Sequence, residues 1–301
     1  MNKSLSFTSH YGFFAILLAA FLWGTTGTAA SFAPNLSPLA IGAAAMGGGG
    51  LLQAFIARKN IRNQFYHIKT HIILLTFGVI SVFIYPLAFY SSMHLAGITI
   101  GTVVSIGTAP LFTALLEKFL DNKKLSVTWF ISFILGITGV ILLTLGETHS
   151  PVNSEKIIRY GKELGIFLGA VAGFSYALYS WAAKKIIDSG VDAKASMGLI
   201  FGLAALLLLP TLFITGPNLF DEHINLYVVV YMIIIPMFLG YVLFGFGLKT
   251  VSASKAITLT LFEPLVAAIL AIALVGEKVA FIGWIGMILI FLCLVLLSKK
   301  D

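Results

Sequence analysis

Apolar runs of about 20 residues recur along almost the whole chain, and they constrain its fold more than any other feature. A helix rises 1.5 Å per residue, so about 20 apolar residues cross a hydrocarbon core about 30 Å thick. Hydrophobic residues make up 59% of the 301 positions and charged residues only 10%. A soluble domain of this length would need a larger share of charged surface. The sequence therefore predicts an all-α integral membrane protein.

Charged or turn-rich segments divide the apolar sequence into ten predicted transmembrane helices. Several of them hold an internal proline, which membrane helices tolerate when neighbouring groups satisfy the freed backbone atoms. The predicted spans cover residues 11–32, 38–57, 71–93, 97–117, 126–146, 164–184, 194–214, 225–247, 253–274 and 279–298.

The distribution of basic residues predicts the orientation. Fifteen of the 19 Lys and Arg residues fall on the side of the two termini, and four fall on the other side. Cytoplasmic loops of membrane proteins carry this excess of basic residues. We therefore expect a multi-pass protein of the cell inner (plasma) membrane with both termini cytoplasmic. The formal net charge of +7 resides in these loops and does not indicate nucleic-acid binding.

The two halves of the sequence resemble each other. A shift of 153 residues places Trp23 on Tyr176, and a shift of 154 places Pro110 on Pro264. Each half holds five predicted spans, and this odd number requires the halves to sit in opposite orientations. The sequence predicts two inverted five-helix repeats, 1–146 and 164–301, joined by a linker at 147–163. Inverted repeats are typical of secondary transporters.

Four consecutive glycines, Gly47 to Gly50, stand within the second apolar run. They lack the Gly-Lys-Ser/Thr ending of a phosphate-binding loop, so we interpret them as a site of close helix packing. The sequence also has no metal-ligand spacing and no nucleophile elbow. We expect neither an enzyme nor a bound metal or cofactor, and we expect the partners to be a small-molecule substrate and the lipid bilayer.

Several motifs resemble the drug/metabolite transporter superfamily, specifically its ten-helix EamA-type carriers, and the resemblance spans essentially the full chain. They are Phe21-Leu22-Trp23-Gly24-Thr25, the run Ala109 to Leu116, Glu263-Pro264-Leu265-Val266-Ala267-Ala268 and Leu274-Val275-Gly276-Glu277-Lys278. The first half departs from the family with Asp121-Asn122-Lys123-Lys124 where a Gly-Glu-Arg type sequence is usual. We expect this difference to affect topology rather than transport. The resemblance implies export of amino acids, amines, nucleosides or drugs, often by proton coupling or exchange.

Glu263 is the only acid that the span boundaries place in the middle of a helix. An ionisable group at that depth is costly unless it faces a cavity or a partner, so function is one interpretation. We expect substrate binding and proton coupling there. The other interpretation is a neutral Glu263 that braces the helix break beside Pro264.

Six aromatic residues lie in helices that, by the resemblance, line a central cavity. Aromatic ring faces can hold a cationic ligand, and ordinary helix packing or an interfacial belt is the alternative. The candidate binding residues are Trp23, Tyr85, Tyr90, Tyr176, Tyr179 and Tyr241.

These residues predict a secondary active transporter that exports a small metabolite, an amino acid or an amine, by alternating access. The alternative is a broad-specificity exporter of lipophilic drugs, which would depend less on Glu263. We expect the cavity between the first, third, fourth, sixth, eighth and ninth helices, with the fifth and tenth peripheral.

Overall fold

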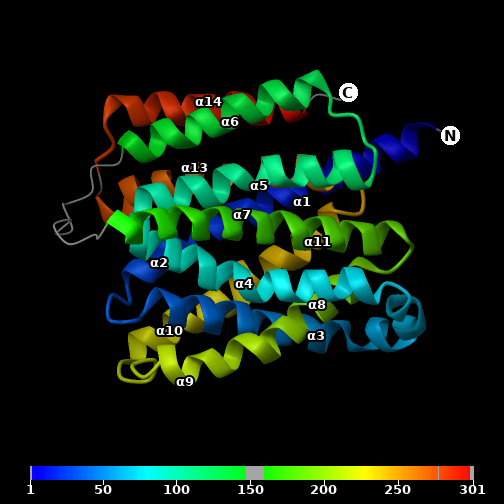
Figure 1. The fold of residues 1–301 in the computed structure, drawn as a ribbon, viewed down its shortest axis with the longest axis horizontal. Helices are drawn as coiled ribbons and strands as arrows, with labels where there is room; N and C mark the ends of the chain where they lie inside the picture. Colours follow the sequence, from blue (N-terminus) through cyan, green and yellow to red (C-terminus); the bar gives the residue numbers. More distant parts are fainter. Residues whose placement is uncertain (1, 147–158, 277, 299–301) are drawn as a thin grey trace.

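The computed structural model describes residues 2–146, 159–276 and 278–298. Within them, ten helices are long and apolar enough to cross a membrane, as the sequence predicts (Figure 1). The spans are His10–Ser31, Pro38–Lys69, Ile72–Ala96, Ile100–Leu120, Val127–Gly146, Gly161–Asp188, Ala193–Thr215, His223–Gly247, Ala253–Leu274 and Phe281–Ser298.

Six spans are single helices: α3 (Pro38–Lys69), α4 (Ile72–Ala96), α5 (Ile98–Leu120), α6 (Val127–Gly146), α7 (Arg159–Asp188) and α14 (Phe281–Ser298). The first span joins α1 (Asn2–Gly24) to α2 (Thr26–Ser31). The others are composite: α8 (Ala193–Leu208), η1 (Leu209–Thr211) and α9 (Leu212–Thr215); α10 (His223–Met232), η2 (Ile233–Gly240) and α11 (Tyr241–Gly247); α12 (Ala253–Leu259), α13 (Phe262–Leu270) and η3 (Ala271–Val275).

Proline accounts for irregularities in the three composite spans of the second half. Pro210 lies in η1, Pro236 lies in the π-helix η2, and Pro264 follows the break between α12 and α13. A proline removes one backbone donor and crowds the preceding turn, so each position favours local rearrangement. Pro86 and Pro110 leave α4 and α5 continuous.

The second span is longer than the sequence predicts. We expected it to end at residue 57, before Arg58 and Lys59, but α3 continues to Lys69. The apolar pattern stops at Arg58, whereas nothing from Arg58 to Lys69 breaks a helix. A hydrogen bond to the second half stabilises the extension: the backbone N–H of Asp192 donates to Gln64 Oε1 at 2.8 Å.

The helix pairs follow the pattern that an inverted repeat requires. Repeat mates pack against each other in α3 with α8, α5 with α12, and α6 with α14 (Figure 1). The remaining pairs exchange mates, because α4 packs on α7 and α1 packs on α11. A two-fold relation between the halves produces both kinds of pair. The predicted linker at 147–163 lies largely outside the described residues, so the domain boundaries stay a prediction.

The glycines of α3 pack as predicted. A Cβ atom on Gly50 would stand 2.4 Å from the carbonyl oxygen of Phe201 in α8. Small residues allow this close approach of two helix backbones in lipid. The pairing of α3 with α8 therefore depends on the missing side chain at Gly50.

We predict that Gly50→Ala destabilises the protein, because a backbone carbonyl cannot move aside as a flexible side chain can. Overpacking of this kind costs about 1–3 kcal/mol. Gly27→Ala is the matched control, since a Cβ there meets nothing within 4 Å. Thermal unfolding in detergent should show a lower midpoint for Gly50→Ala alone. Equal midpoints for the two variants would contradict the packing argument.

Candidate functional site

A pocket of about 70 Å³ lies in the interior between helices of both halves. Six of the seven predicted site residues line it, and Tyr179 does not. The lining residues are Trp23, Thr26, Gly42, Ala45, Met46, Tyr85, Pro86, Phe89, Tyr90, Tyr176, Met232, Met237, Tyr241 and Glu263.

The set of helices around the pocket differs from the expected set in two respects. Gly42, Ala45 and Met46 bring the second span into the wall, and the fourth span contributes no lining residue. Gly42 has no side chain and Ala45 has a small one, so α3 can approach the pocket closely. A Cβ atom on Gly42 would clash with the Tyr90 ring. The fifth and tenth spans are peripheral as expected, because α6 and α14 contribute no lining residue and pack on each other at one edge of the bundle (Figure 1).

Glu263 lies in the first turn of α13, directly after the break in the ninth span. Pro264 cannot donate to Thr260, whose carbonyl instead accepts from the Glu263 backbone N–H at 2.9 Å. A helix N-terminus carries a partial positive charge that favours an acid nearby.

The carboxyl of Glu263 makes no hydrogen bond or ion pair within the described part of the chain, yet it faces the pocket. Tyr85, Tyr90, Tyr176 and Tyr241 line the same pocket. The hydroxyl of Thr260 donates to the Ile257 carbonyl and is also hydrogen-bonded to the Tyr176 hydroxyl. These bonds stabilise the break between α12 and α13. The geometry leaves the Glu263 carboxyl available to a ligand.

Trp23 connects the first span to the eighth. Its indole N–H donates to the carbonyl oxygen of Pro236 at 3.0 Å, and its ring centroid lies 4.7 Å from that of Tyr241. Gln53 donates to the Met237 carbonyl in the same π-helix at 3.3 Å. Two side chains of the first half therefore bond the backbone of η2, the irregular segment beside the pocket.

Tyr179, the seventh candidate residue, lies beside the pocket rather than in its wall. Its side chain is fully buried and stacks on Tyr176, with ring centroids 5.5 Å apart and planes at 17°. Because α7 runs toward the end that carries the termini, Tyr179 lies one turn beyond Tyr176 in that direction. It packs there against Phe201, which is also fully buried. Tyr176, Tyr179 and Phe201 therefore form a continuous row of aromatic rings from the pocket toward that end.

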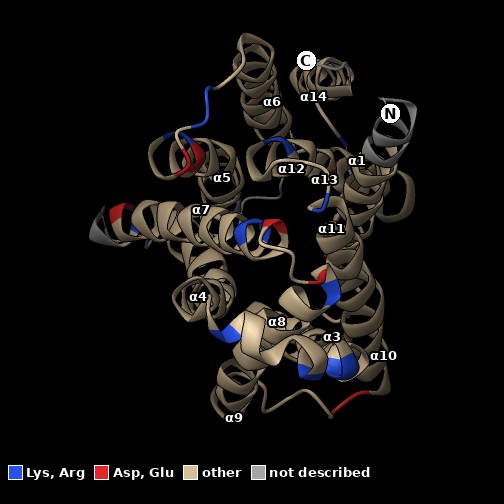
Figure 2. Cartoon of the chain, turned by 90° about the vertical axis from the view of Figure 1, so that its right-hand side faces the viewer, with Lys and Arg blue, Asp and Glu red and all other residues tan. Residues whose placement is uncertain are grey.

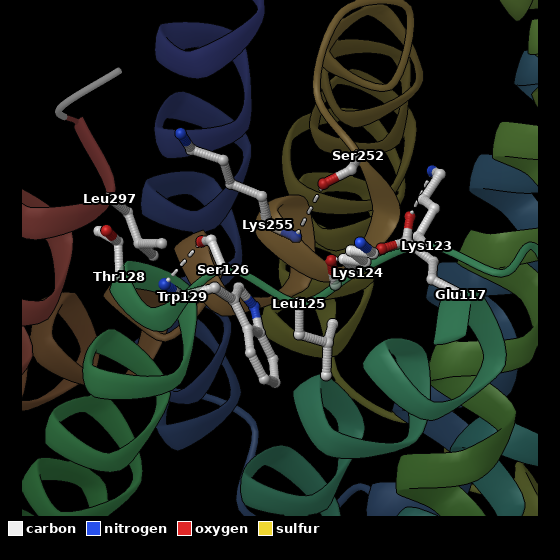
Figure 3. A pocket seen from close by; sticks show the side chains of 11 residues that line it. Glu117, Lys123, Lys124, Leu125, Ser126, Thr128, Trp129, Ser252, Lys255 and Leu297 are labelled. Atoms are coloured by element: carbon white, nitrogen blue, oxygen red, sulfur yellow. Dashed lines mark hydrogen bonds and ion pairs between the residues drawn. The ribbon is translucent and has the colours of Figure 1, made fainter. Parts of the chain in front are cut away.

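Sequence reasoning missed Glu117, which is 2% exposed at the end of α5. The backbone N–H of Ala253 donates to its Oε1 at 3.1 Å, and Ser254 Oγ donates to its Oε2 at 2.5 Å. Lys123 Nζ lies 3.0 Å from Oε1. Figure 3 shows Glu117 and Lys123 beside the segment that begins α12. Glu117 thus joins the fourth span to the ninth at the end where the termini lie.

A signal for Glu117 was present in the sequence. The span boundary at residue 117 placed this acid at a loop, where acids are common and solvated. Its repeat mate at a shift of 154 is Ala271, so the acid is asymmetric in the same way as Glu263. That asymmetry was the available clue.

Asp121 has a structural role at the same end. Trp181 Nε1 donates to its Oδ2 at 3.0 Å, and Lys185 Nζ lies 2.9 Å from its Oδ1. Asp121 belongs to the segment that departs from the Gly-Glu-Arg type sequence. It therefore joins the first half to the sixth span, a contact that the sequence did not reveal.

The opposite end is joined differently. Asn35 donates to Glu222 at 2.9 Å, and the hydroxyls of Thr25 and Tyr231 lie 2.7 Å apart. These bonds link the first and eighth spans. Among the described residues, no hydrogen bond or ion pair connects the far part of α5 with α13. The fourth and ninth spans are therefore held together by polar contacts only at the end that carries the termini.

Comparison with known proteins gives a consistent result. The model of the EamA-like transporter family matches residues 10–145 and again 163–299. The uncharacterized transporter YwfM of Bacillus subtilis (strain 168) is 31% identical over 288 residues, covering 94% of this chain and 92% of its own. The uncharacterized inner membrane transporter YicL of Salmonella typhimurium (strain LT2) is 24% identical, covering 95% of each chain.

A solved crystal structure has the same fold, with a TM-score of 0.78 over 97% of this chain and 96% of that chain at 18% identity. Both halves of the sequence match one family model, as two five-helix repeats should. The chain therefore belongs to the EamA-like transporter family and is a multi-pass membrane transporter rather than an enzyme.

Proposed function

We propose that this transporter is a secondary active carrier that exports a small amino acid or amine by alternating access. The observation that carries the proposal is Glu263, an acid in the pocket whose carboxyl makes no ion pair within the described residues. A cationic or zwitterionic ligand supplies the missing positive charge, and the surrounding aromatic rings favour a cation through their faces.

The pocket size supports a small metabolite. Its volume is about 70 Å³, whereas sites for drug-sized ligands occupy about 300–1,000 Å³. The alternative, a lipophilic drug exporter, is favoured by Met46, Met232 and Met237 in the pocket wall. Flexible thioether side chains can adapt to varied ligands. The two functions differ in their dependence on Glu263.

The substrate class can be identified with purified protein and a thermal-shift screen of amino acids, amines and nucleosides. A ligand present at 100 times its Kd adds about 2.7 kcal/mol to the free energy of unfolding. Stabilisation by amines or amino acids supports the proposal. Stabilisation by uncharged lipophilic compounds alone supports the drug exporter.

The position of Glu263 also supports proton exchange. Its carboxyl can hold either a proton or the cation of a ligand, so the two compete for one group. Binding of a cationic ligand then releases a proton, and export of the ligand can be driven by proton entry. No second acid is needed for this cycle.

We predict that Glu263→Gln removes the pH dependence of binding. In the wild type, affinity for the cationic ligand should fall as the pH falls, because protonation neutralises the carboxylate. Glutamine keeps the shape beside Pro264 and carries no titratable charge, so the variant should fold normally and bind weakly at every pH. Isothermal titration calorimetry across a pH series measures this. A Glu263→Gln variant with wild-type affinity and pH dependence, together with a Glu263→Ala variant that fails to fold, would show that the role is bracing.

Alternating access requires the contacts at the termini end to open. Glu117 accepts bonds from Ala253 and Ser254, so opening that end must expose its buried carboxylate or give it new partners. Hydrogen bonds to a charged group contribute about 1.5–3 kcal/mol each. We propose that these bonds hold the conformation in which the pocket is closed toward the termini.

We predict that Glu117→Gln shifts the population toward opening at the termini end by roughly tenfold or more, since charge-assisted bonds are lost. Spin labels at Lys118 and Lys249, which are exposed on different halves, report the distance by electron paramagnetic resonance. Asp188→Asn is the control, because the ion pair of Asp188 within the described residues is with Lys184 on its own helix. A distance distribution for Glu117→Gln that matches the control would overturn the gating role.

We further propose that both termini are cytoplasmic, from the excess of Lys and Arg at that end. Figure 2 looks onto this end and shows its basic and acidic segments. Cysteines at Ser37, Asn153 and Asn218 should react with an impermeant thiol reagent added to intact cells, and one at Asn63 should not. The native Cys293 is buried and gives no background. Labelling at Asn63 from outside would reverse the orientation.

A further inference from the structure

A second cavity lies on the outer surface of the helix bundle, near the end that carries the termini. It is a groove of about 510 Å³ between α3, α8 and the segment formed by η2 and α11. Its lining residues are Gln53, Ile56, Ala57, Ala193, Lys194, Met197, Phe238, Val242, Leu243, Phe246 and Lys249. None of them lines the pocket at Glu263, so the groove is a separate site.

The walls of the groove are apolar and face outward. Ile56 is 54% exposed and Phe246 is 46% exposed, on opposite walls. At the floor, Gln53 directs its amide group to the Met237 carbonyl. An apolar, outward-facing groove at membrane depth is in contact with lipid acyl chains.

The depth of the groove corresponds to one leaflet. Lys249 is at its mouth, and Phe238 lies eleven residues earlier along the eighth span, roughly 16 Å away at helical rise. This is about half of a hydrocarbon core about 30 Å thick. An acyl chain entering at the mouth would reach the floor near the bilayer midplane.

The mouth is basic. Lys194 and Lys249 line it, and Arg58 follows Ala57 on α3. The acid nearby is Asp192, which lies 4.0 Å from Lys249 and is also engaged by the backbone N–H groups of Lys194 and Ala195. Figure 2 shows basic segments at α3, α8 and α11 around this region. The excess positive charge complements an anionic headgroup.

We propose that the groove binds an anionic phospholipid, with an acyl chain between α3, α8 and α11 and the phosphate on Lys194 and Lys249. Basic pockets between transmembrane helices on the cytoplasmic side take anionic headgroups. The leaflet assignment rests on the orientation proposed above. The binding itself does not depend on transport or on Glu263.

The test is native mass spectrometry of delipidated protein titrated with palmitoyl-oleoyl phosphatidylglycerol or the matching phosphatidylcholine. Phosphatidylglycerol should bind more tightly, and Lys194→Gln/Lys249→Gln should weaken its binding roughly 25-fold, at about fivefold per lysine near a membrane surface. Lys69→Gln/Lys118→Gln removes the same charge from exposed positions at the same end and should bind like the wild type. Val242→Trp fills the groove, keeps both lysines and should also lose binding.

Three further results decide the proposal. Glu263→Gln should bind phosphatidylglycerol as the wild type does, which separates this site from the proposed function. Equal binding of the two lipids, or equal losses in both double-lysine variants, overturns the proposal. A dimer that Val242→Trp converts to a monomer also overturns it, because the groove would then hold a second copy of the chain.

Discussion

The hydrocarbon core of a bilayer offers no partner to a backbone N–H or C=O group, and this constraint decides where the chain can be irregular. The eighth and ninth spans depart from the α-helix beside the pocket, at Pro236 and Pro264. In both places side chains bond the disturbed backbone: Trp23 and Gln53 at η2, and Thr260 at the α12–α13 break. The irregular backbone that shapes the pocket is therefore stabilised by other helices at η2 and by a side chain of the same span at the α12–α13 break.

The two-fold relation between the halves decides which helices pair. A few residues that differ between the halves distinguish the two repeats chemically. The fourth and ninth spans are repeat mates, yet each carries an acid where the other has alanine. Glu117 on the fourth span bonds the start of α12, whereas Glu263 on the ninth span faces the pocket. We therefore propose that this symmetric scaffold carries one acid for closure and another for the ligand. The two acids lie at different depths, so substitution of each should affect a different step of the cycle.

The sequence predicted most of the fold because the length, hydropathy and flanking charges of each segment identify a membrane span without knowledge of tertiary contacts. Ten spans and the inverted halves followed from the apolar runs and their odd number per half. The peripheral fifth and tenth helices followed by analogy with inverted-repeat carriers and from their apolar composition on all sides. Six of the seven candidate site residues line one pocket. Glu263 was found because an intramembrane acid is costly in lipid, and the aromatic residues were selected through the family resemblance. Tyr179 lies outside that pocket, because a buried tyrosine one turn away has the same sequence signal as one that lines a cavity.

What the sequence by itself determined was the number, length and polarity of the membrane helices and the depth of Glu263. These are properties of single segments in contact with lipid. Only the tertiary structure decided that the second span, rather than the fourth, lines the pocket, and that Glu117 and Asp121 are buried partners rather than loop acids. The basic groove between α3, α8 and α11 likewise has no sequence signal. Each of these features depends on which helix faces lie together, and that choice is made by contacts between residues more than 100 positions apart.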